Sequence, residues 1–181
     1  MNNKELSIKL REDARRIGLC DKWYHEWEDE KSKQQLIDLF KRGLDFCLSK
    51  RWPAKPFILH HFSQEILRAN GILVDDKYSF PVRDPEMRRL IYLQDFVLIG
   101  NSSTTIRYSF RPHICNVWAL DDSKVKVDVK YGAFILIHLF DKAHADVTTD
   151  LVSKVTVIRH STESSVFRNG CVTIREEFDY L

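Results

Sequence analysis

The chain has 181 residues, of which 44% are hydrophobic and 30% charged, and its formal net charge is +2. This is the composition of an ordinary globular protein with enough apolar residues for one good core, or for a β unit with a helical attachment. Residues 1–80 carry 15 basic and 13 acidic side chains, and residues 81–181 carry 13 of each. A polyanion-binding surface would concentrate basic residues on one segment or face, so nothing here requires a nucleic-acid partner.

Signals for export, membrane insertion and metal binding are missing from the sequence. The N-terminal stretch MNNKELSIKLREDARR lacks the apolar segment of a secretory signal, and the longest apolar run, residues 133–137, is too short to span a bilayer. The four cysteines (Cys20, Cys47, Cys115 and Cys171) have no CxxC spacing, which argues against a zinc knuckle or a redox pair. We therefore expect a cytoplasmic protein with reduced cysteines, no membrane segment and no cofactor.

Residues 1–71 predict a helical unit of about four helices. The first covers residues 3–17, where apolar side chains recur at helical spacing and Gly18 supplies the residue that ends the helix. Asp21 is positioned to cap a short second helix that continues through Trp27.

The third and fourth predicted helices are longer. Ser32 and Gln35 have the spacing of a capping box, and the third helix then runs to about Ser49. Two prolines interrupt the chain after that point. The fourth helix covers residues 57–70, where Asn70-Gly71 provides the C-terminal signal.

From Asn101 to Glu176 the sequence repeats with a period of about twenty residues. Polar residues that open a turn recur in one column, and apolar residues recur in a second. The first column contains Asn101, Asp121, Asp141 and Ser161, and the second contains Val97, Val117, Ile137 and Val157. Fixed self-similarity at this spacing is typical of a solenoid, whose coils bury apolar residues only against their neighbours.

Each period contains two short strands separated by turns. Val125, Val127 and Val129 alternate with charged residues, which is the pattern of a strand with one buried and one exposed face. A second apolar set follows after the Tyr131-Gly132-Ala133 turn. The pattern starts earlier, at residues 88–98, and it drifts by one residue at Ile106 and Tyr108.

An antiparallel β-sandwich with regular turns would produce a similar pattern, and it is kept as the alternative. We prefer the solenoid because the columns hold their register and because most turns lack the Asn-Gly or Asp-Gly pair of a tight hairpin. The Asn169-Gly170 pair lies in the shortened last period, where a terminal repeat is expected to be atypical.

The predicted fold class is therefore α+β, with a helical unit in residues 1–71 and a repetitive β domain in residues 72–181. An uncovered end of a solenoid exposes apolar side chains and unpaired backbone groups. We expect the helices to cap the first coil for this reason. The last coil leaves an exposed β edge. We expect this edge to pair two copies of the chain into a homo-oligomer.

Three segments carry a resemblance to known sequences. The strings DARRIGLCDKW (residues 13–23), QQLIDLFKRGLDFC (residues 34–47) and LRANGILVDD (residues 67–76) resemble the N-terminal signature of uncharacterised small proteins of gut bacteria, their phages and mobile elements. In those proteins repetitive short strands likewise follow the helices. The resemblance implies a bacterial or phage cytoplasmic protein, but it transfers no catalytic or binding residue because the family has no assigned activity.

Tryptophan and basic side chains cluster in the helical unit. They are Trp23, Trp27 and Trp52, with Lys22 and Arg51 nearby. Tryptophan and arginine dominate protein binding hot spots, and aromatic stacking beside basic residues is also how single-stranded nucleic acid is bound. These residues predict a partner-binding surface. The alternative is that the tryptophans form the core of the helical unit.

The repeat predicts a second candidate surface on the β domain. Trp118, His138 and Ile158 share a column, and strand alternation turns His138 away from Ile137 towards solvent. Such a column forms either an outward aromatic strip that binds a partner or an outer face of the sheet that the helices cover.

No catalytic or metal-binding constellation is found. His61 and Glu65 have the spacing of a helical metal pair, but an HExxH motif and a third ligand are missing, so a surface histidine is the preferred interpretation. Aspartates in the turns (Asp121-Asp122, Asp141 and Asp146) lack a calcium-repeat motif and are explained by bonds to the local backbone. Motifs for phosphate binding and acyl transfer are also missing.

We therefore predict a non-enzymatic protein-interaction or scaffold protein, associated with a phage or mobile element. A repetitive β scaffold without convergent titratable groups provides a surface rather than a reaction site. The alternative function is a nucleic-acid-associated protein that uses the Trp and Lys/Arg surface of the helices, which salt-sensitive binding would reveal.

Overall fold

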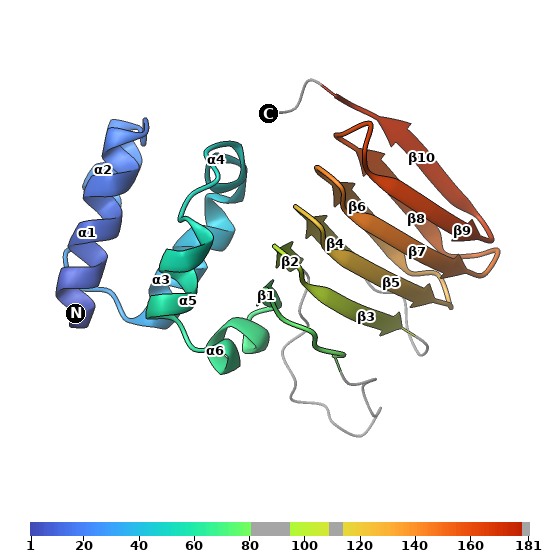
Figure 1. Ribbon diagram of the computed structural model, residues 1–181, viewed down its shortest axis with the longest axis horizontal. Coiled ribbons are helices and arrows are strands. Elements are labelled where there is room, and N and C mark those ends of the chain that lie inside the picture. The colour runs from blue at the N-terminus through green and yellow to red at the C-terminus, as the bar shows by residue number, and fades with distance from the viewer. Residues whose placement is uncertain (81–94, 109–113, 179–181) are drawn as a thin grey trace. The chain divides into compact units, whose positions relative to one another are not determined.

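A computed structural model describes residues 1–80, 95–108 and 114–178 of the chain (Figure 1). The chain divides into two units, Met1–Ile66 and Leu67–Leu181, and each is described by itself. The strands of the described residues all belong to the second unit. The predicted start of the β pattern at residues 88–98 lies partly outside the described residues.

Six helices are present in the described residues, where the sequence predicts about four. They are α1 (Asn3–Arg16), α2 (Asp21–Glu26), α3 (Lys33–Arg42), α4 (Leu44–Ser49), α5 (Lys55–His61) and α6 (Gln64–Ala69). The third predicted helix is interrupted at Gly43. The amide of Gly43 donates to the carbonyl of Leu39 at the end of α3, and α4 begins at the next residue. The fourth is interrupted at Phe62, whose extended backbone (φ −119°, ψ 132°) cannot continue helical hydrogen bonding.

Two of the predicted helix signals are confirmed by hydrogen bonds. Ser32 and Gln35 bond reciprocally through side chain and backbone, which forms the capping box of α3. Gly18 has a φ of +108°, and the amide of Leu19 returns to the carbonyl of Ala14. This is the glycine stop that the sequence predicts for α1.

The predicted cap of α2 is wrong. Cys20 occupies the N-cap position, and Asp21 is the first helical residue, with no side-chain capping hydrogen bond at this helix. The carboxylate of Asp21 instead forms an ion pair with Arg15 of α1. A carboxylate in the first turn still interacts favourably with the helix dipole, which explains an aspartate at this position.

The second unit is a parallel β-solenoid with a repeat of about twenty residues, as predicted (Figure 1). One sheet has the order β1-β2-β4-β6-β8-β10, and the other has the order β3-β5-β7-β9. All pairings between these strands are parallel, so the alternative of an antiparallel sandwich is wrong. The strands are β1 (Ile72–Val74), β2 (Asp95–Ile99), β3 (Ser103–Tyr108), β4 (Ile114–Ala119), β5 (Lys124–Val129), β6 (Phe134–Leu139), β7 (His144–Thr149), β8 (Lys154–Arg159), β9 (Ser165–Asn169) and β10 (Val172–Glu176).

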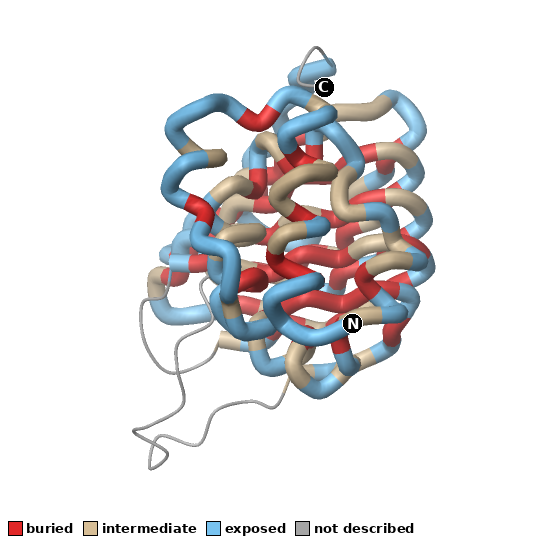
Figure 2. The backbone as a smooth tube through the Cα atoms, turned by 90° about the vertical axis from the view of Figure 1, so that its left-hand side faces the viewer, coloured by how far each residue is buried: buried red, intermediate tan, exposed pale blue. Residues whose placement is uncertain are grey.

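The core of the solenoid lies between the two sheets. The predicted column of Val117, Ile137 and Val157 is confirmed, because these residues pair in register on β4, β6 and β8 and are fully buried. Upstream, the column continues with Phe96 and not with Val97, because the first coil contains one more residue than the second. Figure 2 shows buried and exposed segments alternating along the stacked coils.

Aspartates in the turns connect one coil to the next. Asp121 and Asp141 have positive φ angles of 58° and 49°, a conformation that aspartate tolerates better than most residues. Oδ2 of Asp141 accepts the amide of Asp121 at 2.9 Å, and Oδ2 of Asp121 accepts the amide of Gly100 at 2.7 Å. The polar column of the repeat therefore stabilises the stacking of turns through bonds to the backbone of the neighbouring coil, where the sequence predicts bonds to the local backbone.

The last coil differs from the others at its open edge. Ile174 pairs with Val157, yet it is 37% exposed because β10 is the end of the sheet. In the other sheet Arg168 occupies the column of the buried Val147, and its guanidinium donates to the carbonyl of Val172 at 3.2 Å. A charged residue at an inward position is a common protection of an edge strand. The homo-oligomer through this edge stays a prediction, as does the capping of the first coil by the helices.

Candidate interaction surface

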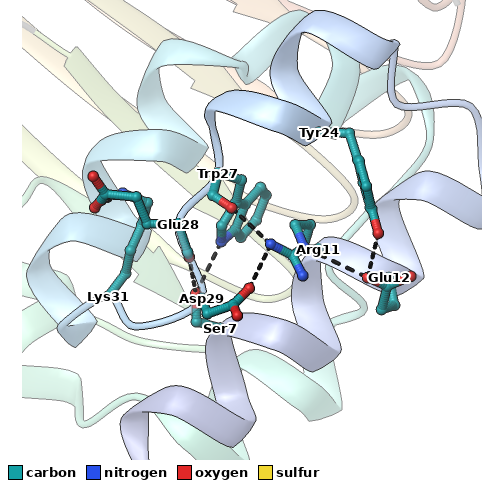
Figure 3. Close-up of polar contacts among 8 residues, drawn as sticks. All are labelled: Ser7, Arg11, Glu12, Tyr24, Trp27, Glu28, Asp29 and Lys31. Carbon is teal, nitrogen blue, oxygen red and sulfur yellow. Dashed lines mark hydrogen bonds and ion pairs between the residues drawn. The ribbon is translucent and has the colours of Figure 1, made fainter.

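Trp27 lies in the core of the helical unit (Figure 3), which corrects its prediction as a surface residue. Its side chain is only 6% exposed, and its indole Nε1 donates to Oγ of Ser7 on α1 at 2.9 Å. The guanidinium of Arg11 donates to the Trp27 carbonyl at 2.9 Å and pairs with Asp29 at 2.7 Å. These contacts satisfy the polar atoms of a buried aromatic residue, so they fix the segment after α2 against α1.

Tyr24 attaches α2 to α1 in a similar way (Figure 3). Its hydroxyl donates to Oε1 of Glu12 at 2.8 Å, and the guanidinium carbons of Arg11 and Arg15 lie 5.0 and 5.4 Å from its ring centroid. The hydrogen bond to Glu12 raises the pKa of Tyr24, because it favours the protonated phenol. The hydroxyl and the ring of Tyr24 are both engaged by residues of the helical unit itself. Tyr24 therefore packs within this unit.

The other predicted residues of the helical surface do not gather into one exposed patch. Trp52 is half-buried, with its ring centroid 6.4 Å from that of Trp27. Trp23 is also half-buried, and the guanidinium of Arg42 covers its ring at 5.0 Å. Lys22 is exposed on α2, and Arg51 is exposed in the turn that follows α4. The structure therefore favours the alternative that the tryptophans pack within the helical unit.

The predicted column of Trp118, His138 and Ile158 exists on the solenoid. The three residues pair in register, and the ring planes of Trp118 and His138 are nearly parallel at 6°. His138 is only 9% exposed, so its predicted orientation towards solvent is wrong. The rings of Trp118 and His160 lie on either side of it, with ring centroids 5.7 and 5.2 Å away.

His138 and His160 form a hydrogen-bonded pair. Nδ1 of His138 lies 2.9 Å from Nε2 of His160, and Nδ1 of His160 lies 2.9 Å from the carbonyl oxygen of Glu177. A carbonyl oxygen only accepts, so Nδ1 of His160 carries a proton. When His160 is neutral, its Nε2 accepts from His138. Burial lowers the pKa of His160, although the Glu177 carbonyl acts in the opposite direction.

This pair predicts a loss of stability at mildly acidic pH. Because the folded pKa of His160 is below its ordinary value of about 6.5, the unfolded chain binds the proton first, and folding stability falls as pH decreases below that value. We expect His160→Gln to reduce the slope of unfolding free energy against pH between about 7.5 and 5, by less than the one-proton limit of about 1.4 kcal/mol per pH unit. Urea titrations at several pH values measure this slope. Equal slopes for the two proteins would contradict the prediction.

His61 and Glu65, whose spacing in the sequence is that of a helical metal pair, do not share a helix. His61 ends α5 and Glu65 belongs to α6, with the break between them. The ring of His61 packs against Phe57 with centroids 4.3 Å apart, and burial lowers the pKa of His61. Nowhere in the described residues do three or more His, Cys, Asp or Glu side chains form a group that could hold a metal ion.

An exposed apolar strip follows one corner of the solenoid, and sequence reasoning missed it. We call it the corner ridge; it consists of Ile114, Tyr131, Phe134, Leu151 and Val152. These side chains are between 49% (Phe134) and 88% (Leu151) exposed. Ile114 and Phe134 open β4 and β6 and pair in register, while the other three lie in the turns before β6 and β8. Side chains of this size that are exposed on successive coils are unusual unless they serve an interaction.

The repeat itself contains the signal that would have revealed the ridge. Tyr131 and Leu151 are twenty residues apart and occupy equivalent turns, whereas the turns at the opposite corner of each coil carry Asp121 and Asp141. The core does not require apolar residues at matching positions of two polar turns. The neighbouring strands, which alternate buried and exposed side chains, already supply the core residues. The same register that predicts buried columns therefore also predicts exposed ones.

The turns that carry the ridge are held rigidly by side-chain acceptors. Oδ2 of Asp150 accepts the amide of Tyr131 at 2.7 Å, and Oγ of Ser153 accepts the amides of Gly132 and Ala133 at 3.2 Å each. Oδ1 of Asp150 also accepts the amide of Ser153 at 2.8 Å. The pKa of Asp150 is lowered, chiefly by its hydrogen bond to Ser153. The apolar side chains thus project from a fixed backbone.

Fold and surface together define a class: a short parallel β-solenoid with a helical N-terminal unit and an exposed apolar corner. The chain matches no protein-family model, no curated protein and no solved structure. None of the helices in the described residues has the length and apolar character needed to cross a membrane.

Proposed function

We propose that this protein is a non-enzymatic interaction protein that binds a protein partner through the corner ridge. The observation that supports this proposal is the exposure of five large apolar side chains on successive coils of one corner. Large apolar side chains that are exposed on successive coils cost solubility, and partner binding is the usual reason for keeping them. The N-terminal resemblance supports a bacterial or phage cytoplasm as the setting.

The ridge also suits binding energetically. Its turns are ordered by hydrogen bonds before any partner arrives, so association does not have to order the backbone. Phe134, Tyr131 and Leu151 supply large apolar area from a few positions, as binding hot spots do. The nucleic-acid alternative is not retained, because Trp27 is buried and the other tryptophans are half-buried.

The proposal is tested by site-specific photo-crosslinking in cells that produce the intact chain. We expect p-benzoylphenylalanine at position 151 to form a discrete adduct with a partner protein. The double substitution Phe134→Asp with Tyr131→Asp in the same chain should reduce this adduct at least about tenfold, because buried charges weaken an apolar contact strongly. All these side chains are exposed, so the fold is expected to persist, and circular dichroism checks it.

A matched control places the photoreactive residue at Lys124, which is exposed on β5 away from the ridge. The proposal requires no equivalent adduct from this position. An adduct of the same size from both positions, or one that survives the double substitution, would show that the ridge is not the binding surface.

A further inference from the structure

Resting on the proposed function, we propose that the corner ridge binds an amphipathic α-helix of the partner, laid along the solenoid axis, with acidic residues beside its apolar face. Three features of the ridge carry this inference: the state of its backbone groups, the spacing of its side chains and the charges beside it.

The backbone of the ridge offers no strand edge to a partner. The amides of Tyr131, Gly132 and Ala133 are already taken by Asp150 and Ser153. The edge strands of the two sheets are β1 and β10 in one and β3 and β9 in the other, so they lie at the ends of the stack and not along this corner. A partner strand would leave its own amides and carbonyls unpaired against the apolar side chains, which is costly. A helix has its backbone hydrogen bonds satisfied internally and avoids this cost.

The spacing along the ridge also matches a helix. Tyr131 and Leu151 occupy equivalent turns of neighbouring coils, and the parallel strands of neighbouring coils are about 4.8 Å apart. Side chains three residues apart on a helix are separated by about 4.5 Å along its axis, so they interdigitate with successive coils. Side chains on one face of a strand recur at about 6.7 Å, which falls out of register after one coil.

The charges beside the ridge favour an acidic partner. Lys130 and Lys154 are exposed and flank the ridge, one after β5 and the other at the start of β8. In the described part of the chain, neither lysine forms a salt bridge with an acidic side chain. Lys154 instead lies over the ring of Phe134, with Nζ 5.7 Å from the ring centroid. The carboxylate of Asp150 is engaged by turn amides.

Three synthetic peptides of about fifteen residues, a length at which isolated helices become marginally stable, test the proposal on the intact chain. Two share a leucine stripe at helical spacing and differ only in flanking glutamates or flanking lysines. The third is the acidic peptide with its central residues replaced by prolines, which prevent a helix. Fluorescence anisotropy at low and high salt measures binding. We expect the acidic helical peptide to bind at least about fivefold tighter than the basic one at low salt.

Two variants connect the result to named residues. Leu151→Asp should abolish binding of the acidic peptide, and Lys130→Glu with Lys154→Glu should remove its advantage over the basic peptide while leaving the apolar contact. Equal binding of the proline peptide, equal binding of the basic peptide, or failure of all three to bind would overturn the proposal. Self-association of the chain that Leu151→Asp abolishes would also overturn it, because a second copy would then occupy the ridge.

The function and the further inference fail in distinguishable ways. If the peptides do not discriminate but the crosslink at position 151 depends on the ridge, the interaction role stands and only the helical, acidic partner is excluded. If the crosslink is independent of the ridge, the proposed function fails regardless of the peptide result.

Discussion

Replacing Ile137 with alanine is expected to destabilise the solenoid by about 3 kcal/mol, close to the middle of the range for deleting a buried isoleucine side chain to Ala. Ile137 is fully buried at the centre of β6 and pairs with Val117 on one side and Val157 on the other. The parallel ladders hold the neighbouring coils at a fixed spacing, so the structure has little freedom to collapse into the cavity. Urea unfolding followed by circular dichroism measures the effect.

Thr156→Ala is the matched control for this prediction. Thr156 lies on β8 next to Val157, on the opposite face of the strand, and is only half-buried. Because each coil contacts only its neighbours, the loss at Ile137 should spread to both adjoining coils. We expect the control to cost less than about 1 kcal/mol. A comparable loss in both variants would contradict the assignment of the core to the column of Ile137.

The second large effect is expected for Gly170→Ala, at the turn between β9 and β10. A Cβ atom at this position would lie 2.1 Å from the carbonyl oxygen of Thr149, and the φ angle of +102° is itself unfavourable for alanine. Because the obstacle is backbone and cannot rotate away, the turn must move and β10 must lose part of its pairing with β8. We expect a loss of more than about 2 kcal/mol, combining backbone strain and overpacking.

Gly18→Ala separates the two causes. Gly18 has a similar φ angle of +108°, but nothing lies within 4 Å of a Cβ placed there. This variant should show the backbone cost alone, about 1 kcal/mol. Hydrogen exchange of the β10 amides distinguishes the variants, since Gly170→Ala should accelerate exchange there and Gly18→Ala should not. Slow exchange at β10 in Gly170→Ala would contradict the predicted clash.

The repeat could be predicted from the sequence because residues at a fixed separation along the chain are in contact in a solenoid. Residues one period apart stack directly, so Val117, Ile137 and Val157 reveal their column without knowledge of any distant partner. The placement of Val97 in this column is wrong, because the first coil has one more residue, which moves Val97 into register with Trp118. The same extra residue places Ile106 opposite Val127, which is the one-residue drift that the sequence shows at this point.

The helical unit was predicted less well because its breaks depend on packing. Gly43 can lie inside a helix at modest cost, and nothing in the local sequence of Phe62 forbids helical backbone. Whether such positions end a helix depends on the contacts that each segment makes on either side. Signals that depend on neighbouring residues alone, such as the capping box of Ser32 and Gln35, were correctly predicted.

The candidate surface illustrates the same difference. An exposed tryptophan and a buried one look alike in a sequence, and only the hydrogen bond of Trp27 to Ser7, twenty residues away, places its ring in the core. Likewise, the turn residues Tyr131 and Leu151 become one surface only when the coils stack.

By itself the sequence determined the period, the parallel stacking that the period favours, the alternation of the strands and the local helix signals. These are properties of residues that are close in the chain or one coil apart. The tertiary structure alone decided which aromatic side chains are buried and where apolar side chains remain exposed together. The physical reason is that burial depends on what packs against a residue from outside its own segment, and no local pattern contains that information.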